Sequence, residues 1–346
     1  MGRGKIRAGV VAFACAVSAL AVTAGPARAD NGNGKGDDKK AEHARVEAFW
    51  TPARVAKAVP RDYVIDPQTG KLKPMAKPAA NGGNTAGLSW TKGGAVLQTT
   101  GKVLFEMSGS YYVCSASVVK DGNTDNGRSI ILTAAHCVID ESNGTFATNW
   151  MFIPDYDTIP APLDTSGSFC AQTRLGCWVA DSLVVSKAFA DAGGFTNVAI
   201  LHDYAFAVVG EGTKTGAQLD ASVPGGGQAI AFGTVSNNTS VSLFGYPAAQ
   251  KYSGTDLIYS RGPLGRDPYQ NNATYKVTSD QTGGSSGGPW FKGFSDTGST
   301  LGTGTLMSIN SYGYGGIKAM HGPVLNDETQ AMFNAAKTTD DDVKYG

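Results

Sequence analysis

From about Leu88 to Ile317, short runs of β-branched and aromatic residues alternate with turn residues, and this pattern most constrains the fold. The separating residues are Gly, Asn, Asp and Pro, and the chain holds 46 glycines, which hairpin turns use freely and helices tolerate poorly. Regular short strands without long helical periods indicate an all-β sandwich or a pair of barrels. The predicted strands are Ala95–Leu97, Val103–Met107, Tyr111–Val119, Ile130–Leu132, Trp150–Ile153, Leu183–Val185, Ala205–Val209, Gln228–Ala231, Ser242–Phe244, Leu257–Tyr259, Thr274–Val277, Pro289–Phe291 and Leu306–Ile309.

One helix is predicted near the C-terminus. It is capped by Asn326 or Asp327 and runs to Lys337, with Met332 and Phe333 on one side at helical spacing. The β part spans about 245 residues, which is enough to bury a substantial core as two packed β-barrels.

The N-terminus has the composition of a secretory signal. Basic residues precede an uncharged apolar stretch from Ala8 to Ala24, and Ala27 and Ala29 then place small residues at a cleavage site. The stretch is too short for a membrane anchor, so residues 1–29 are predicted to be a signal peptide. We expect the mature protein to be soluble and secreted, without a membrane association.

The composition changes between Asp30 and about Ala86. This stretch is rich in polar residues and prolines, and it shows no pattern that would bury a core of its own. A short amphipathic helix is predicted from Ala41 to Phe49. We expect residues 30–87 to be a largely disordered pro-segment that is removed on maturation, and residues 88–346 to be the folded domain. A retained disordered extension is the alternative.

The cysteines predict two disulfides. Cys15 leaves with the signal peptide, and the four that remain are an even set in an oxidising compartment. Three pairings are possible, and pairing of nearest neighbours is preferred. Cys114–Cys137 would tie two predicted strands together, and Cys170–Cys177 would close a short loop.

No metal site is predicted. A zinc site is disfavoured because the chain has neither a Cys-x-x-Cys pair nor a His-Glu-x-x-His motif. The stretch from Asp121 to Gly127 is superficially similar to a calcium loop, but its glycine comes one place late and the twelfth position is Leu132. A long polar hairpin explains this stretch better. The formal net charge is zero, so no basic field points to nucleic acid.

Two small-residue motifs carry the candidate chemistry. His136 stands in Thr-Ala-Ala-His-Cys after a predicted buried strand, and Ser286 stands in Gly-Ser-Ser-Gly-Gly-Pro, 150 residues later. A serine attacks only when a base takes its proton and backbone donors receive the oxyanion. His136 is the candidate base, Ser286 the nucleophile, and the N–H groups of Gly284 and Ser286 the oxyanion hole. Ser285 is the alternative nucleophile.

The base requires a carboxylate that orients its ring. Asp203 is the best candidate because it precedes the alternating apolar run that ends at Val209, so it would stand at the mouth of a core strand. Asp181 and Asp191 are the alternatives.

The residues Gly284–Gly288 also match the Gly-x-Ser-x-Gly elbow of α/β-hydrolases. That fold requires parallel strands with helical crossovers and a histidine after the serine. Here the candidate base and acid precede the serine, the helices are missing, and His321 is the one later histidine. The α/β-hydrolase interpretation is therefore disfavoured.

Taken in this order, the motifs resemble those of the chymotrypsin-like serine peptidases. The resemblance covers roughly residues 92–335 and implies two antiparallel six-stranded β-barrels with the active site between them. It also implies a Cys114–Cys137 bridge beside the base. Ser311, Tyr312 and Gly313 look like the strand that pairs with substrate backbone, with Ser311 supporting Asp203. The implied activity is hydrolysis of protein or peptide substrates through an acyl-enzyme, by a monomer that needs no cofactor.

One departure separates this chain from animal members, which carry an aspartate immediately before the nucleophile. Ser285 occupies that position and cannot pair with a freed N-terminal amine. The chain is therefore more similar to the secreted bacterial, glutamyl-endopeptidase-like (V8-like) branch.

The substrate preference stays open. Asp280 lies six residues before Ser286, where trypsin-like members hold the acid that pairs with Arg or Lys. Asn310 or Ser311 stands where glutamyl-specific members carry a histidine. Basic, acidic and other preferences all remain, as do two other functions on the same fold: a noncatalytic binding module and a secreted esterase.

Overall fold

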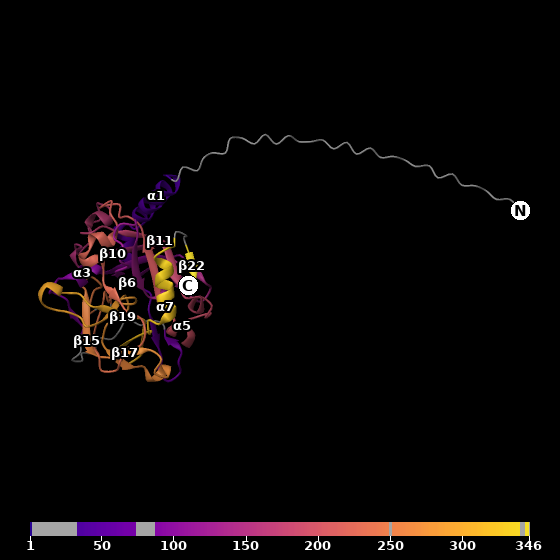
Figure 1. The fold of residues 1–346 in the computed structure, drawn as a ribbon, viewed down its shortest axis with the longest axis vertical. Helices are drawn as coiled ribbons and strands as arrows, with labels where there is room; N and C mark the ends of the chain where they lie inside the picture. The colour runs from indigo at the N-terminus through magenta and orange to yellow at the C-terminus, as the bar shows by residue number, and fades with distance from the viewer. Residues whose placement is uncertain (2–32, 74–86, 249–250, 340–342, 346) are drawn as a thin grey trace.

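The structure is a computed structural model whose body is built around strands, with helices at its surface (Figure 1). It describes Met1 and residues 33–73, 87–248, 251–339 and 343–345. The predicted signal peptide, apart from Met1, lies outside the described residues.

The first half is a closed antiparallel barrel of six strands. Strand pairing runs β6–β5–β10–β11–β12–β7, and β6 also pairs with β7 to close the ring. Apolar side chains on its strands, such as Phe105, Ile131 and Phe206, are fully buried. The strands are β5 (Thr100–Met107), β6 (Ser110–Val119), β7 (Ser129–Thr133), β10 (Thr148–Pro154), β11 (Trp178–Val185) and β12 (Ala205–Val209).

The second half encloses a separate apolar core that includes Val241, Tyr275 and Trp290. Two sheets supply it, one with β14, β15, β18 and β19, the other with β17, β20 and β21, and these strands pair antiparallel. The two-barrel, all-β prediction is thus confirmed. The strands are β14 (Ser240–Gly245), β15 (Ile258–Pro263), β17 (Tyr275–Thr278), β18 (Pro289–Lys292), β19 (Thr305–Ile309), β20 (Tyr312–Tyr314) and β21 (Ala319–Gly322).

Short strands and helices complete the described part of the chain. None of the helices in the described ranges has the length and apolar character that crossing a membrane requires. The short strands are β1 (Val59–Pro60), β2 (Tyr63–Ile65), β3 (Leu72–Lys73), β4 (Leu88–Ser89), β8 (Ile139–Asp140), β9 (Thr145–Phe146), β13 (Ala229–Ile230), β16 (Gly265–Arg266) and β22 (Val343–Tyr345). The helices are α1 (Asn33–Phe49), α2 (Pro52–Lys57), α3 (Ala95–Thr99), α4 (Lys187–Ala190), α5 (Asn197–Leu201), α6 (Leu219–Ser222) and α7 (Asp327–Ala336). Single 3₁₀ turns are η1 (Ala135–Cys137), η2 (Tyr156–Thr158), η3 (Cys170–Gln172), η4 (Pro224–Gly226), η5 (Pro268–Gln270) and η6 (Gly298–Thr300).

The C-terminal helix α7 is where the sequence predicts it. Asn326 caps it, with its side chain accepting from the Thr329 N–H at 3.1 Å. Met332 and Phe333 are buried, and the Phe333 ring lies 5.4 Å from that of Phe206 in the first barrel. The amphipathic pattern therefore packs this helix onto the barrel wall.

The predicted strand Ala95–Leu97 is wrong, because these residues begin helix α3. Ala, Leu and Gln favour helix, and the Thr99 hydroxyl donates back to the Ala95 carbonyl at 2.9 Å. A run of three apolar residues is too short for periodicity to separate a buried strand from a buried helix.

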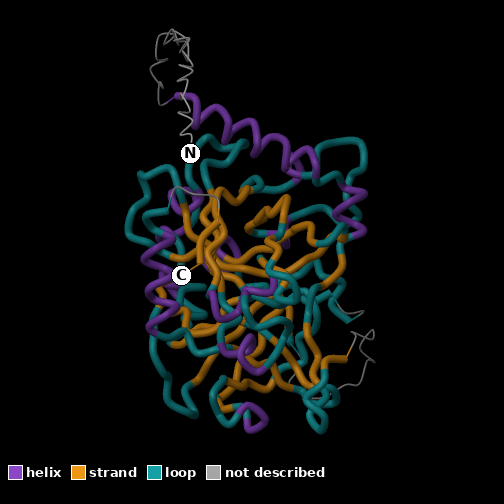
Figure 2. Tube along the Cα trace, turned by 90° about the vertical axis from the view of Figure 1, so that its right-hand side faces the viewer, coloured by secondary structure: helices purple, strands orange, loops and turns teal. Residues whose placement is uncertain are grey.

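Residues 33–73 differ from the expected disorder, because they form α1, α2 and β1–β3 against the rest of the molecule. Figure 2 shows α1 lying across one end of the strands, and it contacts β10 and β11. Val46, Trp50 and Val55 are buried, and the Trp50 indole donates to the Asn149 carbonyl at 2.7 Å. This stretch has too few apolar residues for a core of its own, but they are enough to complete the barrel surface. The predicted helix end at Phe49 is confirmed.

Both preferred disulfides are present, Cys114–Cys137 and Cys170–Cys177. The first joins β6 to the 3₁₀ turn η1, and the second closes the short loop before β11.

Candidate active site

His136 and Asp203 meet because their strands are neighbours. His136 lies in η1 just after β7, and Asp203 lies just before β12, which pairs antiparallel with β7 in the register Ala205↔Thr133. His136 Nδ1 is 2.8 Å from Asp203 Oδ2, and the His136 backbone N–H donates to Oδ1 at 2.9 Å. Both side chains are fully buried. The carboxylate thus holds the ring with Nε2 pointing away from it.

Ser311 adds a third contact to this carboxylate. It follows β19 in the second half, and its hydroxyl donates to Asp203 Oδ2. The predicted support of Asp203 by Ser311 therefore joins the two halves of the molecule at this point.

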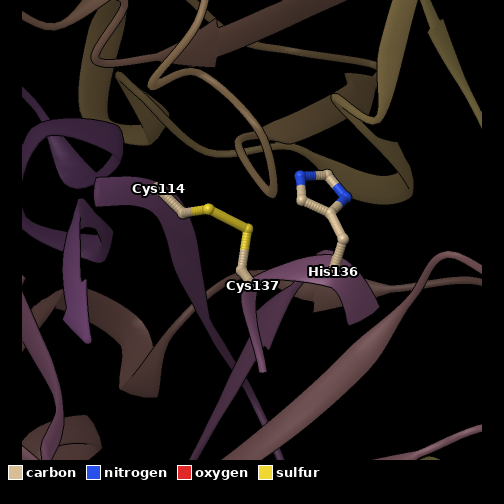
Figure 3. Close-up of side chains that lie close together, drawn as sticks. All are labelled: Cys114, His136 and Cys137. Carbon is tan, nitrogen blue, oxygen red and sulfur yellow. A yellow bond between two sulfur atoms is a disulfide. The ribbon is translucent and has the colours of Figure 1, made fainter. Parts of the chain in front are cut away.

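Figure 3 shows the Cys114–Cys137 disulfide beside the His136 ring. Among the described residues, these three form the one group of His, Cys and acidic side chains close enough together to suggest a metal ion. Both sulfurs are already bonded to each other, so neither is a thiolate ligand. The group therefore fits a structural bridge beside the histidine.

Glycine is required around Ser286 for steric reasons. Gly284 and Gly287 have φ of +96° and +81°, which L side chains rarely adopt. A Cβ on Gly287 would lie 2.2 Å from Thr133 Oγ1, so the loop is pressed against the first barrel. Ser115 holds it there, with its N–H donating to the Ser286 carbonyl at 2.7 Å and its hydroxyl to the Gly284 carbonyl at 2.8 Å.

Asn310 is a structural residue of this loop that the sequence reasoning missed. Its fully buried amide donates to the carbonyls of Ser285 at 3.0 Å and Phe244 at 2.9 Å, and it accepts from the Trp290 indole at 2.7 Å. A polar residue ending the predicted Leu306–Ile309 strand was the available signal. Its partners lie 20 to 66 residues away in the chain, so that signal did not identify them.

The alternative residues are engaged elsewhere. Ser285 is fully buried and its hydroxyl donates to the Thr282 carbonyl at 2.8 Å. Asp181 pairs with His43 at 2.7 Å, and Asp191 pairs with Lys187. His321 stacks against Tyr312, and burial lowers its pKa to about 4. In the described part of the chain, no side-chain hydrogen bond joins any of these four residues to His136 or Ser286.

The Ser286 hydroxyl makes no hydrogen bond to His136 in this structure. It donates instead to Asp62 Oδ1, and His136 Nε2 is buried without a hydrogen-bond partner among the described residues. The Gly284 N–H donates to Asp62 Oδ2 at 2.6 Å, and the Ser286 N–H acts on the same carboxyl group by opposing the rise of its pKa. Both predicted oxyanion-hole donors therefore act on one carboxyl group.

Asp280 is held by its own chain. Lys251 Nζ lies 2.7 Å from its Oδ2, and the Tyr252 hydroxyl and the Gly87 N–H both reach Oδ1, the latter at 2.6 Å. Burial alone raises the pKa of this carboxyl, but the contacts with Lys251 and Tyr252 outweigh it and keep the pKa below its ordinary value. The charge of Asp280 is thus already compensated.

Buried hydrogen bonds hold the predicted substrate strand, β20, in place. Tyr312 and Tyr314 of β20 both donate to Asp267, at 2.6 Å and 2.8 Å, and Asp267 is fully buried. Sequence reasoning missed Asp267, whose position before η5 has no motif. β20 pairs with β21 along one edge and in parallel with β2 along the other, in the register Tyr63↔Tyr312.

A closed antiparallel six-stranded barrel, a second β half, a buried His–Asp pair and a glycine-framed serine define a protein of the chymotrypsin-like class. No family model matches the chain, and no curated protein sequence matches it either. Solved structures do match it. The protease Anisep from Arthrobacter nicotinovorans is 33% identical with a TM-score of 0.56, covering 71% of this chain and 98% of that one.

The thermostable serine protease AL20 from an extremophilic microorganism is 34% identical with a TM-score of 0.57, covering 71% of this chain and 100% of that one. A Glu endopeptidase is 16% identical with a TM-score of 0.51, covering 73% and 96%, which is a likeness of fold. The chain belongs to the chymotrypsin-like serine protease family.

Proposed function

We propose that this protein is a secreted serine endopeptidase in which Ser286 attacks, His136 transfers the proton and Asp203 orients the ring. The observation that carries the proposal is the convergence of the Gly284 and Ser286 donors and the Ser286 hydroxyl on a single carboxylate. Donors arranged in this way suit the negative oxygen of a tetrahedral intermediate.

The reaction follows from these positions. With Asp62 absent, the Ser286 hydroxyl turns to His136 Nε2, which takes its proton as the oxygen attacks the peptide carbonyl. The oxyanion is received by the N–H groups of Gly284 and Ser286, and His136 then protonates the departing amine. Water, deprotonated by His136, hydrolyses the acyl-enzyme and releases the new carboxyl end. Asp203, held by Ser311, stabilises the imidazolium in both steps.

The remaining features of the proposal concern processing and substrate. Residues 1–29 direct secretion, residues 30–87 are removed, and the monomeric enzyme acts outside the cell on proteins or peptides, without nucleic acid or membrane partners. Side chains and backbone donors supply the chemistry without a cofactor or metal. Because Lys251 already compensates the charge of Asp280, a preference for side chains other than Arg and Lys is favoured.

The test is covalent labelling of the secreted, matured protein with a fluorophosphonate, together with cleavage of a random peptide library. Ser286→Ala should abolish both labelling and cleavage. Ser285→Ala is the matched control and should still label. Persistent labelling of Ser286→Ala would refute the assignment. Failure of the parent protein to label or cleave would favour a binding module, and hydrolysis of acyl esters alone would favour an esterase.

A further inference from the structure

The catalytic site is covered by a segment of the same chain, residues 59–65. Its first strand, β1, pairs in parallel with β6 of the first barrel, in the register Val59↔Tyr112. Its second strand, β2, pairs in parallel with β20 of the second half. The segment therefore passes from one half of the molecule to the other, directly over the predicted catalytic residues.

Asp62 lies at the centre of this crossing. Its two carboxylate oxygens accept from the Gly284 N–H and the Ser286 hydroxyl, which are groups that a reacting peptide would use. A side-chain carboxylate is a poor target for serine, because it is already negative and has no amine to release. Asp62 thus fills the oxyanion hole without presenting a bond that can be cleaved.

The net pKa of Asp62 is raised above the ordinary value of an aspartate. Burial raises the pKa of Asp62, and the hydrogen bond from Ser286 and the nearby His136 oppose that rise. Burying a carboxyl group is costly unless it is hydrogen-bonded, and the Gly284 N–H and the Ser286 hydroxyl supply the hydrogen bonds here.

The neighbours of Asp62 cover His136 itself. The Tyr63 ring stacks on Phe195 with centroids 3.9 Å apart and meets the His136 ring edge-on at 5.2 Å. Arg61 donates to the His136 carbonyl and pairs with Glu141 at 3.0 Å. The Tyr63 hydroxyl donates to Glu141 as well. The Arg61-Asp62-Tyr63 triplet therefore occupies the site through hydrogen bonds, an ion pair and ring contacts.

The preceding helices anchor the segment outside the site. Trp50 is fully buried, and the Arg45 guanidinium donates to the Asn149 side chain at 2.9 Å. His43 Nε2 lies 2.7 Å from Asp181. Attachment through this second surface raises the effective concentration of residues 59–65 at the catalytic site.

We propose that residues 59–65 are an inhibitory segment for this catalytic site, with Asp62 occupying the oxyanion hole. The surface formed by Gly284, Ser286, His136, Phe195 and β20 is the docking site for this Arg-Asp-Tyr peptide, in the intact chain and after its release. This inference rests on the proposed function, because it names the regulation of the same site.

The first experiment measures how fast a fluorophosphonate labels the intact chain after signal removal, read on the full-length band. Asp62→Ala removes the carboxylate, and Asp62→Asn keeps its shape without its charge. We expect both to label faster, Asp62→Ala by at least about tenfold, because hydrogen bonds to a charged group are lost. Asp66→Asn is the matched control, since the Asp66 carboxylate accepts from Gln68 and Thr69 in its own turn, and it should label at the parent rate.

The second experiment adds a synthetic peptide of residues 59–65 to the matured protein. Peptide-library cleavage should be inhibited competitively by this peptide and at least about tenfold more weakly by its Asp62→Asn version. Equal labelling rates in parent and Asp62 variants, with cleavage intact, would overturn the inference and leave the proposed function standing. No labelling in any variant, even after proteolytic removal of residues 30–87, would overturn both.

Discussion

Asn310 provides a sharp test of how the loop around Ser286 is held. Replacing Asn310 by Asp keeps the shape of the side chain but turns its NH₂ donor into an oxygen. The carbonyls of Ser285 and Phe244 then face an acceptor instead of a donor, whereas the Trp290 indole keeps its partner.

The magnitude follows from two buried carbonyls that lose their donor. Each costs about 1–3 kcal/mol, so Asn310→Asp should lower the free energy of unfolding by roughly 2–6 kcal/mol. In a domain of this size, that corresponds to a fall in melting temperature of roughly 4–24 °C. The Ser285 carbonyl and the Ser286 N–H belong to the same peptide group, so displacing the carbonyl also displaces this predicted oxyanion donor. We therefore expect kcat to fall as well, by at most the factor of about a hundred to a thousand that losing one oxyanion donor typically costs.

The assay is urea unfolding in a Ser286→Ala background, which prevents self-cleavage. Asn326→Asp is the matched control, because Asn326 serves α7 through its oxygen, which accepts from the Thr329 N–H. An Asp there preserves the cap, so we expect little change in stability. If Asn310→Asp and Asn326→Asp shifted the urea midpoint equally, the role assigned to the Asn310 amide would be wrong.

Three other changes address separate parts of the molecule. Ser311→Ala should lower the free energy of unfolding by about 1.5–3 kcal/mol, because the buried Asp203 carboxylate loses a donor, and an unchanged denaturation midpoint would contradict this. Lys251→Met should free the charge of Asp280 and raise kcat/KM for substrates with Arg relative to Leu before the cleaved bond; an unchanged ratio would exclude Asp280 from that pocket. Burial lowers the pKa of Lys102 to about 7. Between about pH 7 and 10, Lys102 is therefore neutral in the native state but still protonated in the unfolded chain. Because the unfolded chain binds the extra proton, the free energy of unfolding rises with pH over this range. Lys102→Met should flatten that rise in melting temperature, and the same slope in both proteins would disprove it.

The features predicted well from sequence are those set by short-range chemistry. The strand pattern led to the two β halves, and the cap at Asn326 led to helix α7. The glycines beside Ser286 were recognisable because positive φ and the absence of Cβ are demands of the local backbone. Nearest-neighbour pairing gave both disulfides.

The features that were missed depend on partners far along the chain. Asn310 and Asp267 carry no motif, and their importance comes from carbonyls and hydroxyls delivered by other strands. The three-residue run at Ala95 was too short to separate helix from strand. Asp280 was recognisable by its distance from Ser286, but its pairing with Lys251 was not.

The amino-acid order alone determined which residue types are available: an imidazole, a carboxylate and a glycine-framed hydroxyl, placed at the ends of β segments. Tertiary structure decided which of these groups meet. It brought His136 and Asp203 together through the pairing of β7 with β12. It also placed Asp62 on Ser286 across 224 residues of chain. The physical reason is that strand propensity and turn chemistry act over a few residues, whereas hydrogen-bond partners inside a β protein are chosen by the packing of the whole chain.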